Sequence, residues 1–79
     1  METWAIECKC ILAAFGLYDG QIIGGIKTYR DWDNGEGSYV NYYIPRLTWD
    51  LGDLTGAEVM PISEGDFLKH FEILSESYI

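Results

Sequence analysis

The sequence predicts an α+β domain, in which one C-terminal helix packs on a twisted antiparallel β-meander of three or four strands. Polarity alternates over the first segment, two glycine-containing turn signals separate further strand-like segments, and helical spacing of apolar residues is confined to the C-terminal part. The 79 residues are enough for one small domain, 1–79, and a hydrophobic content of 48% is typical of a folded chain.

The first segment, residues 4–14, has the period of a strand. Its even-numbered positions are apolar, whereas Glu7 and Lys9 fall on the opposite face. A helix would place these two charges on different sides, so the strand is the preferred interpretation. A helix over residues 3–15, ended by Gly16, stays open as the alternative because Ala13 and Ala14 weaken the end of the strand pattern.

Two turn signals bound the second segment. Asp19-Gly20 predicts a hairpin turn between apolar runs, and Asn34-Gly35 predicts the next turn. A strand is expected between them, over about 21–32. Gly24-Gly25 in its middle predicts a bulge or a sharp bend, because glycine weakens a regular strand.

The third segment, from Ser38 to about Trp49, is rich in tyrosine and β-branched residues, which predicts a strand. Pro45 cannot donate to a ladder, so this strand is expected to lie at an edge or to break there. Asp50-Leu-Gly-Asp predicts a turn, and residues 54–60 form either a loop or a short fourth strand.

The last segment carries the signals of a helix. Ser63 is the expected N-cap and Asp66 its partner three residues later, and acidic residues in the first turn suit the helix dipole. The apolar residues that follow recur at helical spacing and would pack on the sheet: Phe67, Leu68, Phe71, Leu74 and Tyr78.

The net charge of −8 is unevenly distributed along the chain. Residues 1–30 contain three acids and three bases, so they are neutral (3 − 3 = 0). Residues 31–79 contain ten acids against Arg46 and Lys69, so they hold the whole excess (2 − 10 = −8). This division predicts an electrostatically one-sided molecule if the fold separates the two halves.

The sequence contains no catalytic signature, so an enzyme is not expected. His70 is the only histidine and lies at the flank of the predicted helix, where a structural role is more common than catalysis. Cys8 and Cys10 alternate into the expected core without a cationic neighbour, which predicts inert thiols, and their spacing suits a disulfide poorly. Free thiols and the lack of a basic leader or long apolar run predict a cytoplasmic protein without a membrane segment.

Metals, cofactors and nucleic acid are also not expected as ligands. Zinc would need more than two cysteines. The acidic stretch that begins at Asp31 has oxygen ligands at alternate positions, but a calcium loop requires glycine where Glu36 stands and glutamate where Tyr42 stands. Five bases against thirteen acids leave no footprint for phosphate or for an anionic membrane.

The remaining function is binding to a larger protein or complex with a basic surface. Carboxylates at the turns, flanked by exposed tryptophans, could occupy a surface that otherwise holds DNA or RNA. If the turns line up at one end of the meander, they form a carboxylate ridge. The predicted partner-binding residues are Asp31, Trp32, Asp33, Glu36, Trp49, Asp50, Asp53, Glu58, Glu64 and Asp66.

In size, charge and lack of catalytic groups, the chain resembles the small acidic proteins with which phages disarm host nucleic-acid machinery, including anti-CRISPR proteins. The resemblance implies an inhibitor and carries no residue roles with it. The alternative is a generic interaction module, such as a toxin-neutralising immunity protein or a small accessory subunit. A homodimer through the edge of the third strand is a further possibility.

Overall fold

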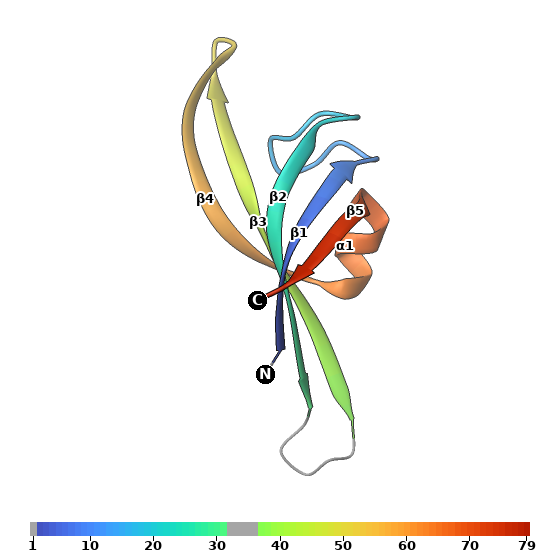
Figure 1. Ribbon diagram of the computed structural model, residues 1–79. Coiled ribbons are helices and arrows are strands. Elements are labelled where there is room, and N and C mark those ends of the chain that lie inside the picture. Colours follow the sequence, from blue (N-terminus) through green and yellow to red (C-terminus); the bar gives the residue numbers. More distant parts are fainter. Residues whose placement is uncertain (1, 32–36) are drawn as a thin grey trace.

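The computed structural model describes residues 2–31 and 37–79, which form five strands and one short helix (Figure 1). The strand order is β4-β3-β2-β1-β5, and every neighbouring pair is antiparallel. The α+β class is confirmed, but the expected number of three or four strands is wrong. The elements are β1 (Glu2–Cys10), β2 (Ile22–Asp31), β3 (Ser38–Asp50), β4 (Asp53–Ser63), α1 (Glu64–His70) and β5 (Phe71–Tyr78).

The C-terminal segment differs most from the expectation. Ser63 is the N-cap, and its Oγ accepts the Asp66 backbone N–H at 3.4 Å, as predicted. The helix ends at His70, however, and β5 then pairs with β1. The helical interpretation of residues 71–78 is therefore wrong. Pairing gives β1 a second neighbour and satisfies the backbone groups along that side, which outweighs a helical spacing of apolar residues.

The first strand is confirmed, and the helix over residues 3–15 is wrong. Ile6, Cys8 and Cys10 are buried at every second position, and the alternation stops there because the chain leaves the sheet. Asp19-Gly20 does form a turn, in which the Gln21 N–H donates to the Tyr18 carbonyl at 3.1 Å. That turn belongs to a longer loop over residues 11–21, so it does not join the two strands directly.

The glycine pair in β2 causes no bulge in the ladder with β1. The register runs without a slip from Glu2–Tyr29 to Lys9–Ile22, so the expectation of a bulge is wrong for this ladder. The glycines lie instead where β3 leaves β2, beyond the Ile26–Tyr43 pair. A Cβ on Gly25 would come within 2.9 Å of the Tyr43 carbonyl oxygen, so glycine at this position allows β2 and β3 to approach closely.

β3 lies between β2 and β4 and continues unbroken through Pro45, but at Pro45 it pairs with β4 alone, so this part of the strand is an edge, as expected. Pro45 is tolerated because it lies beyond the last β2–β3 pair, Ile26–Tyr43, where no β2 acceptor is available. The edges of the sheet are β4 and β5. Beyond Tyr43 one side of β3 has no β2 partner, and the homodimer through this strand stays a prediction.

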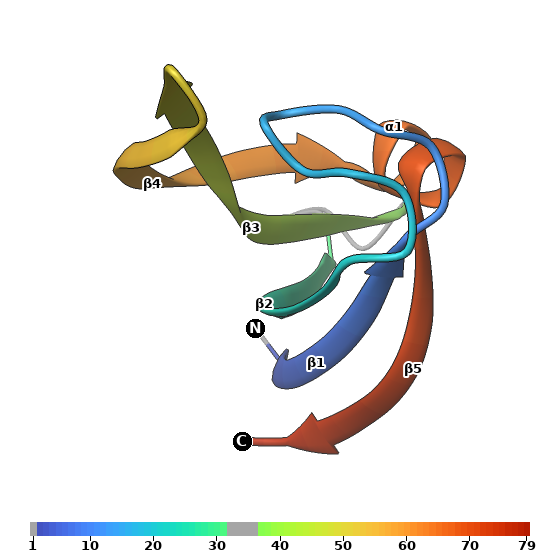
Figure 2. The same ribbon diagram turned by 90° about the horizontal axis from the view of Figure 1, so that it is seen from above.

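The core lies between the curved sheet and α1. Figure 2 shows the sheet curving so that α1, at the end of β4, lies beside the start of β5. The Phe67 ring stacks on Tyr42, with centroids 3.7 Å apart, and on Phe71 at 5.2 Å. The buried residues come from four strands, the helix and the loop: Ile6, Cys8, Cys10, Leu17, Tyr42, Ile44, Ile62, Phe67 and Phe71.

One part of the β3–β4 hairpin extends beyond the rest of the sheet. Residues 44–60, which we call the arm, pair with each other from Ile44–Met60 to Asp50–Asp53 after β3 has left β2. The arm projects at one end in Figure 1, and the molecule measures 49 × 22 × 21 Å. Within residues 2–31 and 37–79, no helix has the length and apolar character needed to cross a membrane.

Candidate binding surface

Asp31 and Asp50, which border two of the predicted acidic turns, lie at opposite ends of the molecule. Asp31 ends β2 beside the start of β3, whereas Asp50 ends β3. Thirteen residues of extended β3 separate these positions by about 40 Å. Consecutive turns of a meander alternate between the ends of a sheet, so the expected carboxylate ridge along one end is wrong. Trp32, Asp33 and Glu36 lie outside the described residues.

A different grouping of the predicted residues follows β4. Trp49, Asp50 and Asp53 lie at the tip of the arm, Glu58 lies along its outer strand, and Glu64 and Asp66 begin α1. Residues 44–66 contain five acids and one base, so they carry half of the net charge (1 − 5 = −4). Among the described residues the one ion pair is Lys27–Glu76, at 3.0 Å, so none of these five carboxylates forms an ion pair, although Arg46 is the cross-strand neighbour of Glu58.

The spacing of these carboxylates is wider than that of phosphates in a nucleic acid. Asp53 and Glu58 are five residues apart on an extended strand, which corresponds to about 17 Å. Phosphates along one DNA strand follow each other at about 3.4 Å along the helix axis. The five acids of residues 44–66 therefore suit long-range attraction to a basic surface, and their spacing does not reproduce that of a phosphate backbone.

The tip of the arm exposes apolar residues that the sequence reasoning missed. Leu51 and Gly52 both have positive φ, +49° and +84°, as a two-residue hairpin turn requires. Leu51 is 98% exposed, and Leu54 beside it is also exposed. The signal was present in Asp50-Leu-Gly-Asp, because an apolar residue at the centre of a tight turn cannot be buried by the hairpin itself.

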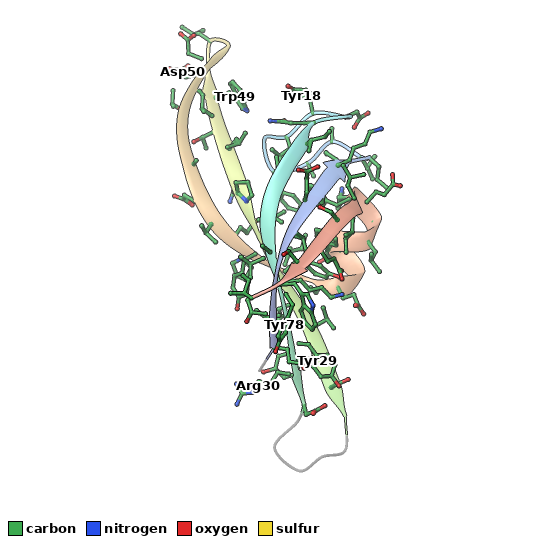
Figure 3. The ribbon with its side chains drawn as sticks, viewed as in Figure 1. Tyr18, Tyr29, Arg30, Trp49, Asp50 and Tyr78 are labelled. Atoms are coloured by element: carbon green, nitrogen blue, oxygen red, sulfur yellow. The ribbon has the colours of Figure 1, made fainter. Side chains whose placement is uncertain are left out.

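A side-chain hydrogen bond and a backbone hydrogen bond attach the arm to the loop over residues 11–21. The Trp49 Nε1–H donates to the Gly16 carbonyl at 2.7 Å, and the Leu47 N–H donates to the Phe15 carbonyl at 2.9 Å. In Figure 3 Trp49 and Asp50 lie at the same end as Tyr18, whereas Tyr29 and Arg30 lie toward the other end. The arm is therefore held in one position although β2 no longer supports it.

The side chains that could be reactive, a histidine and two cysteines, are hydrogen-bonded or buried within the fold. The His70 ring lies edge-on to Phe15, and its Nδ1 is 3.1 Å from the Leu12 carbonyl oxygen, to which it donates as N–H. Cys8 and Cys10 are both free and buried. Burial, with smaller contributions from Cys10 and Glu7, raises the pKa of the Cys8 thiol to about 11. In the described part of the chain, no three histidine, cysteine or acidic residues gather as a metal site would require.

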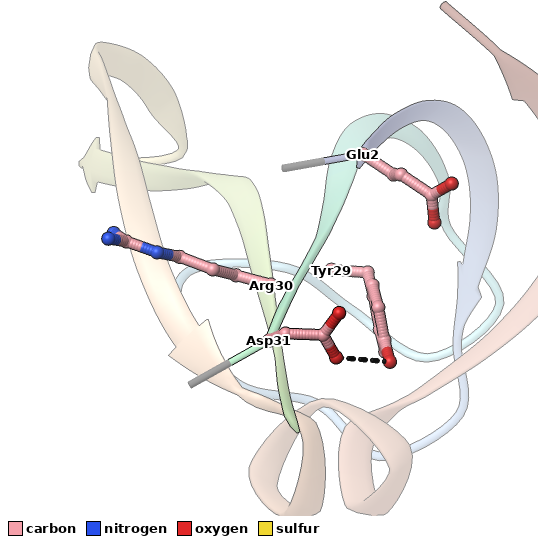
Figure 4. A pocket seen from close by; sticks show the side chains of 4 residues that line it. All are labelled: Glu2, Tyr29, Arg30 and Asp31. Carbon is pink, nitrogen blue, oxygen red and sulfur yellow. Dashed lines mark hydrogen bonds between the residues drawn. The ribbon is translucent and has the colours of Figure 1, made fainter. Parts of the chain in front are cut away.

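Two surface hollows contain no nucleophile–base pair. The first, about 250 Å³, is lined by Glu2, Tyr29, Arg30 and Asp31, and there the Tyr29 hydroxyl donates to Asp31 Oδ1 at 2.8 Å (Figure 4). The Arg30 side chain points away from this pair in Figure 4. The second hollow, about 350 Å³, lies in the fork between β2 and β3 and is mainly apolar, with Ile26, Tyr43, Pro45 and Val59 in its lining.

The raised thiol pKa predicts a loss of stability in alkaline solution. Below pH 9 the Cys8 thiol is protonated in both states, whereas between pH 9 and about 11 it ionises only in the unfolded chain. The free energy of unfolding should therefore fall as the pH rises through this window. Urea unfolding at pH 7, 9, 10 and 11 measures the effect.

Cys8→Ala is the control for this titration. The pKa values of Tyr42 and Lys27 are also raised, so part of the alkaline loss should persist in the variant. Tyr42 is raised mainly by burial and Lys27 mainly by its hydrogen bond to Glu76. An identical decline in the wild type and in Cys8→Ala between pH 9 and 10 would contradict the assignment to the thiol.

No protein family, curated protein or solved structure matches this chain.

Proposed function

We propose that this protein is a non-enzymatic binding protein that attaches to the basic surface of a larger protein, of the kind that holds DNA or RNA, and inhibits it by occupying that surface. One observation carries the proposal. Half of the net charge lies along residues 44–66, and none of these carboxylates forms an ion pair within the described chain. A partner with clustered lysine and arginine would supply the missing counter-charges.

The positions of the reactive groups support binding over catalysis. An active site needs a nucleophile, a base and an accessible hollow that brings them together. Here the buried Cys8 thiol has a raised pKa, and the His70 ring is engaged by the loop. Neither described hollow includes one of these groups in its lining.

The charge also argues for a protein partner in place of nucleic acid itself. A chain with a net charge of −8 is repelled by phosphates and by anionic lipid headgroups. The wide spacing along β4 means that attraction is spread over the length of the arm and α1. We therefore expect association to be fast at low salt and to weaken as salt screens the charges.

The test compares two isosteric triple variants that change the net charge equally. The arm variant is Asp50→Asn with Asp53→Asn and Glu58→Gln, and the matched control on β1 and β5, away from the arm, is Glu2→Gln with Glu7→Gln and Glu72→Gln. Each variant moves the net charge from −8 to −5 (−8 + 3 = −5). Wild-type protein immobilised on a column is used to isolate the partner from the native host at low salt, and binding of the purified partner is then measured.

The arm variant should bind at least about tenfold more weakly than wild type, a loss typical of several charge pairs at an interface, and the control variant should bind nearly as well as wild type. Equal losses would mean that only the net charge matters, and the proposed contact would be wrong. A partner that has no basic surface, or whose binding ignores salt, would instead favour a generic interaction module such as an immunity protein.

A further inference from the structure

We infer that the tip of the arm, residues 49–54, is an apolar anchor that inserts Leu51 into a pocket on the partner protein, and that basic residues around this pocket contact Asp50 and Asp53. The inference rests on the proposed function and adds to it the short-range contact. Charge along the arm explains attraction over distance. It does not explain why three large apolar side chains, Trp49, Leu51 and Leu54, are exposed at the tip.

Leu51 is a poor residue for the position that it occupies. Its φ of +49° lies in the left-handed region, which glycine and asparagine adopt with less steric cost than leucine. Its side chain is 98% exposed, so packing within this chain does not compensate. Leu51 neither suits the turn nor contributes to the core. Burial of its side chain by a partner would explain why a leucine occupies this position.

The tip is presented by a preorganised support. Two hydrogen bonds hold the arm to the loop, from Leu47 N–H to Phe15 O and from Trp49 Nε1–H to Gly16 O. A third bond, from Thr55 Oγ1–H to Thr48 O, joins the two strands of the arm itself. A rigid projection loses little conformational entropy when it binds, so the apolar contact retains more of its free energy. This is the arrangement expected of an anchor residue in a protein interface.

Further exposed apolar residues gather at the same end of the sheet. This is the end at which β1 and β3 finish and β2 and β4 begin, so the loop over residues 11–21 lies there as well. The exposed large apolar residues of this end are Ile11, Leu12, Tyr18, Ile22, Trp49, Leu51 and Leu54. They provide contact area beside the anchor for a partner that covers the end of the molecule.

The charges around Leu51 select the kind of partner. Asp50 and Asp53 pair with each other across the turn, and neither forms an ion pair within the described chain. Two carboxylates beside the anchor oppose insertion into an anionic membrane, and they repel the same tip of a second copy. A protein pocket with a lysine or arginine rim satisfies both the apolar and the charged parts of the tip.

The decisive variant is Leu51→Asn. Asparagine suits the left-handed position and precedes Gly52, so the variant should fold and raise Tm by about 4 °C, as expected for a modest gain in a domain of this size. It removes the anchor, so it should bind the partner purified on the wild-type column at least about tenfold more weakly. Leu74→Asn is the matched control, because Leu74 is exposed on β5, away from the arm, and this variant should bind as wild type does.

The outcomes distinguish what the tip contacts: a protein pocket, a membrane or a second copy of this chain. Wild-type affinity of Leu51→Asn for the purified partner overturns the anchor, while loss of binding in the arm charge variant would still support the proposed function. Sedimentation of wild type with phosphatidylcholine vesicles, abolished by Leu51→Asn, overturns the protein pocket in favour of a membrane. Dimerisation of wild type at high salt, abolished by Leu51→Asn in sedimentation velocity, overturns it in favour of a second copy. If the wild-type column retains no salt-sensitive protein, the proposed function itself is wrong, and the inference fails with it.

Discussion

Gly16→Ala is expected to destabilise the protein by about 3–5 kcal/mol and to release the arm from the loop. A Cβ at this position would overlap the backbone carbonyl oxygen of Leu47, and backbone atoms cannot move aside as a flexible side chain can. The φ of +77° adds a cost of about 1–2 kcal/mol for any residue with a side chain. Displacing the loop would also weaken the hydrogen bonds that reach it from Leu47 and Trp49, each worth about 1 kcal/mol.

Gly20→Ala is the control that separates the cost of the steric overlap at Gly16 from the cost of a positive φ. Gly20 has a similar φ of +88°, but a Cβ there would meet open space, so only the conformational cost of about 1–2 kcal/mol applies. Urea unfolding measures both variants, and the NMR resonance of the Trp49 indole N–H reports whether its bond to the Gly16 carbonyl persists. Equal losses of stability in the two variants would show that the close approach to the arm contributes nothing.

Phe67→Ala is expected to cost about 3–5 kcal/mol, the usual range for removing a fully enclosed aromatic ring. Phe67 is the buried residue of α1, and its ring stacks on Tyr42 and Phe71. A helix of seven residues is not stable in isolation, so α1 depends on this contact. Loss of the ring should therefore also loosen the start of β5, which follows α1 directly.

Leu68→Ala is the control from the same helix turn. Leu68 is largely exposed, so its truncation should change the free energy of unfolding by less than about 0.5 kcal/mol. Hydrogen exchange can follow the β5 amides in both variants, and they should lose protection in Phe67→Ala alone. A small effect of Phe67→Ala on urea unfolding would contradict the central role of the aromatic stack.

Local signals in the sequence were sufficient for several elements. Alternation at Ile6, Cys8 and Cys10 predicted both the strand and the buried face. Ser63 with Asp66 predicted the start of the helix, because an N-cap depends only on residues within one turn. Asp50-Leu-Gly-Asp predicted the turn that the structure places at the tip of the arm.

Residues 71–78 show where local signals were ambiguous. Their apolar residues recur at helical spacing, but Phe71 and Ile73 also alternate with polar Glu72 as a strand would. The choice depends on β1, which lies some sixty residues earlier in the chain and pairs with this segment. No window of sequence contains both partners, so the fifth strand could not be predicted from periodicity alone.

Some properties of the candidate site could also be predicted from the sequence, and others could not. The net charge of −8, its concentration after residue 30 and the exposure of turn carboxylates follow from composition and polarity. The positions of these carboxylates do not, because the ends of β2 and β3, with Asp31 and Asp50, lie at opposite ends of the molecule. The role of Leu51 also required the structure, since its exposure and its positive φ are visible only in the folded hairpin.

Four properties could be predicted from the sequence: the α+β class, the buried face of β1, the helix cap and the acidic character of the protein. These properties depend on side-chain polarity and on hydrogen bonds between near neighbours in the chain. Three features became visible in the folded protein alone: residues 71–78 form a strand, the arm extends beyond β2, and an apolar tip lies between carboxylates. Each of these depends on contacts between distant segments, such as β5 with β1 and Gly16 with Leu47, whose free energy no local pattern contains.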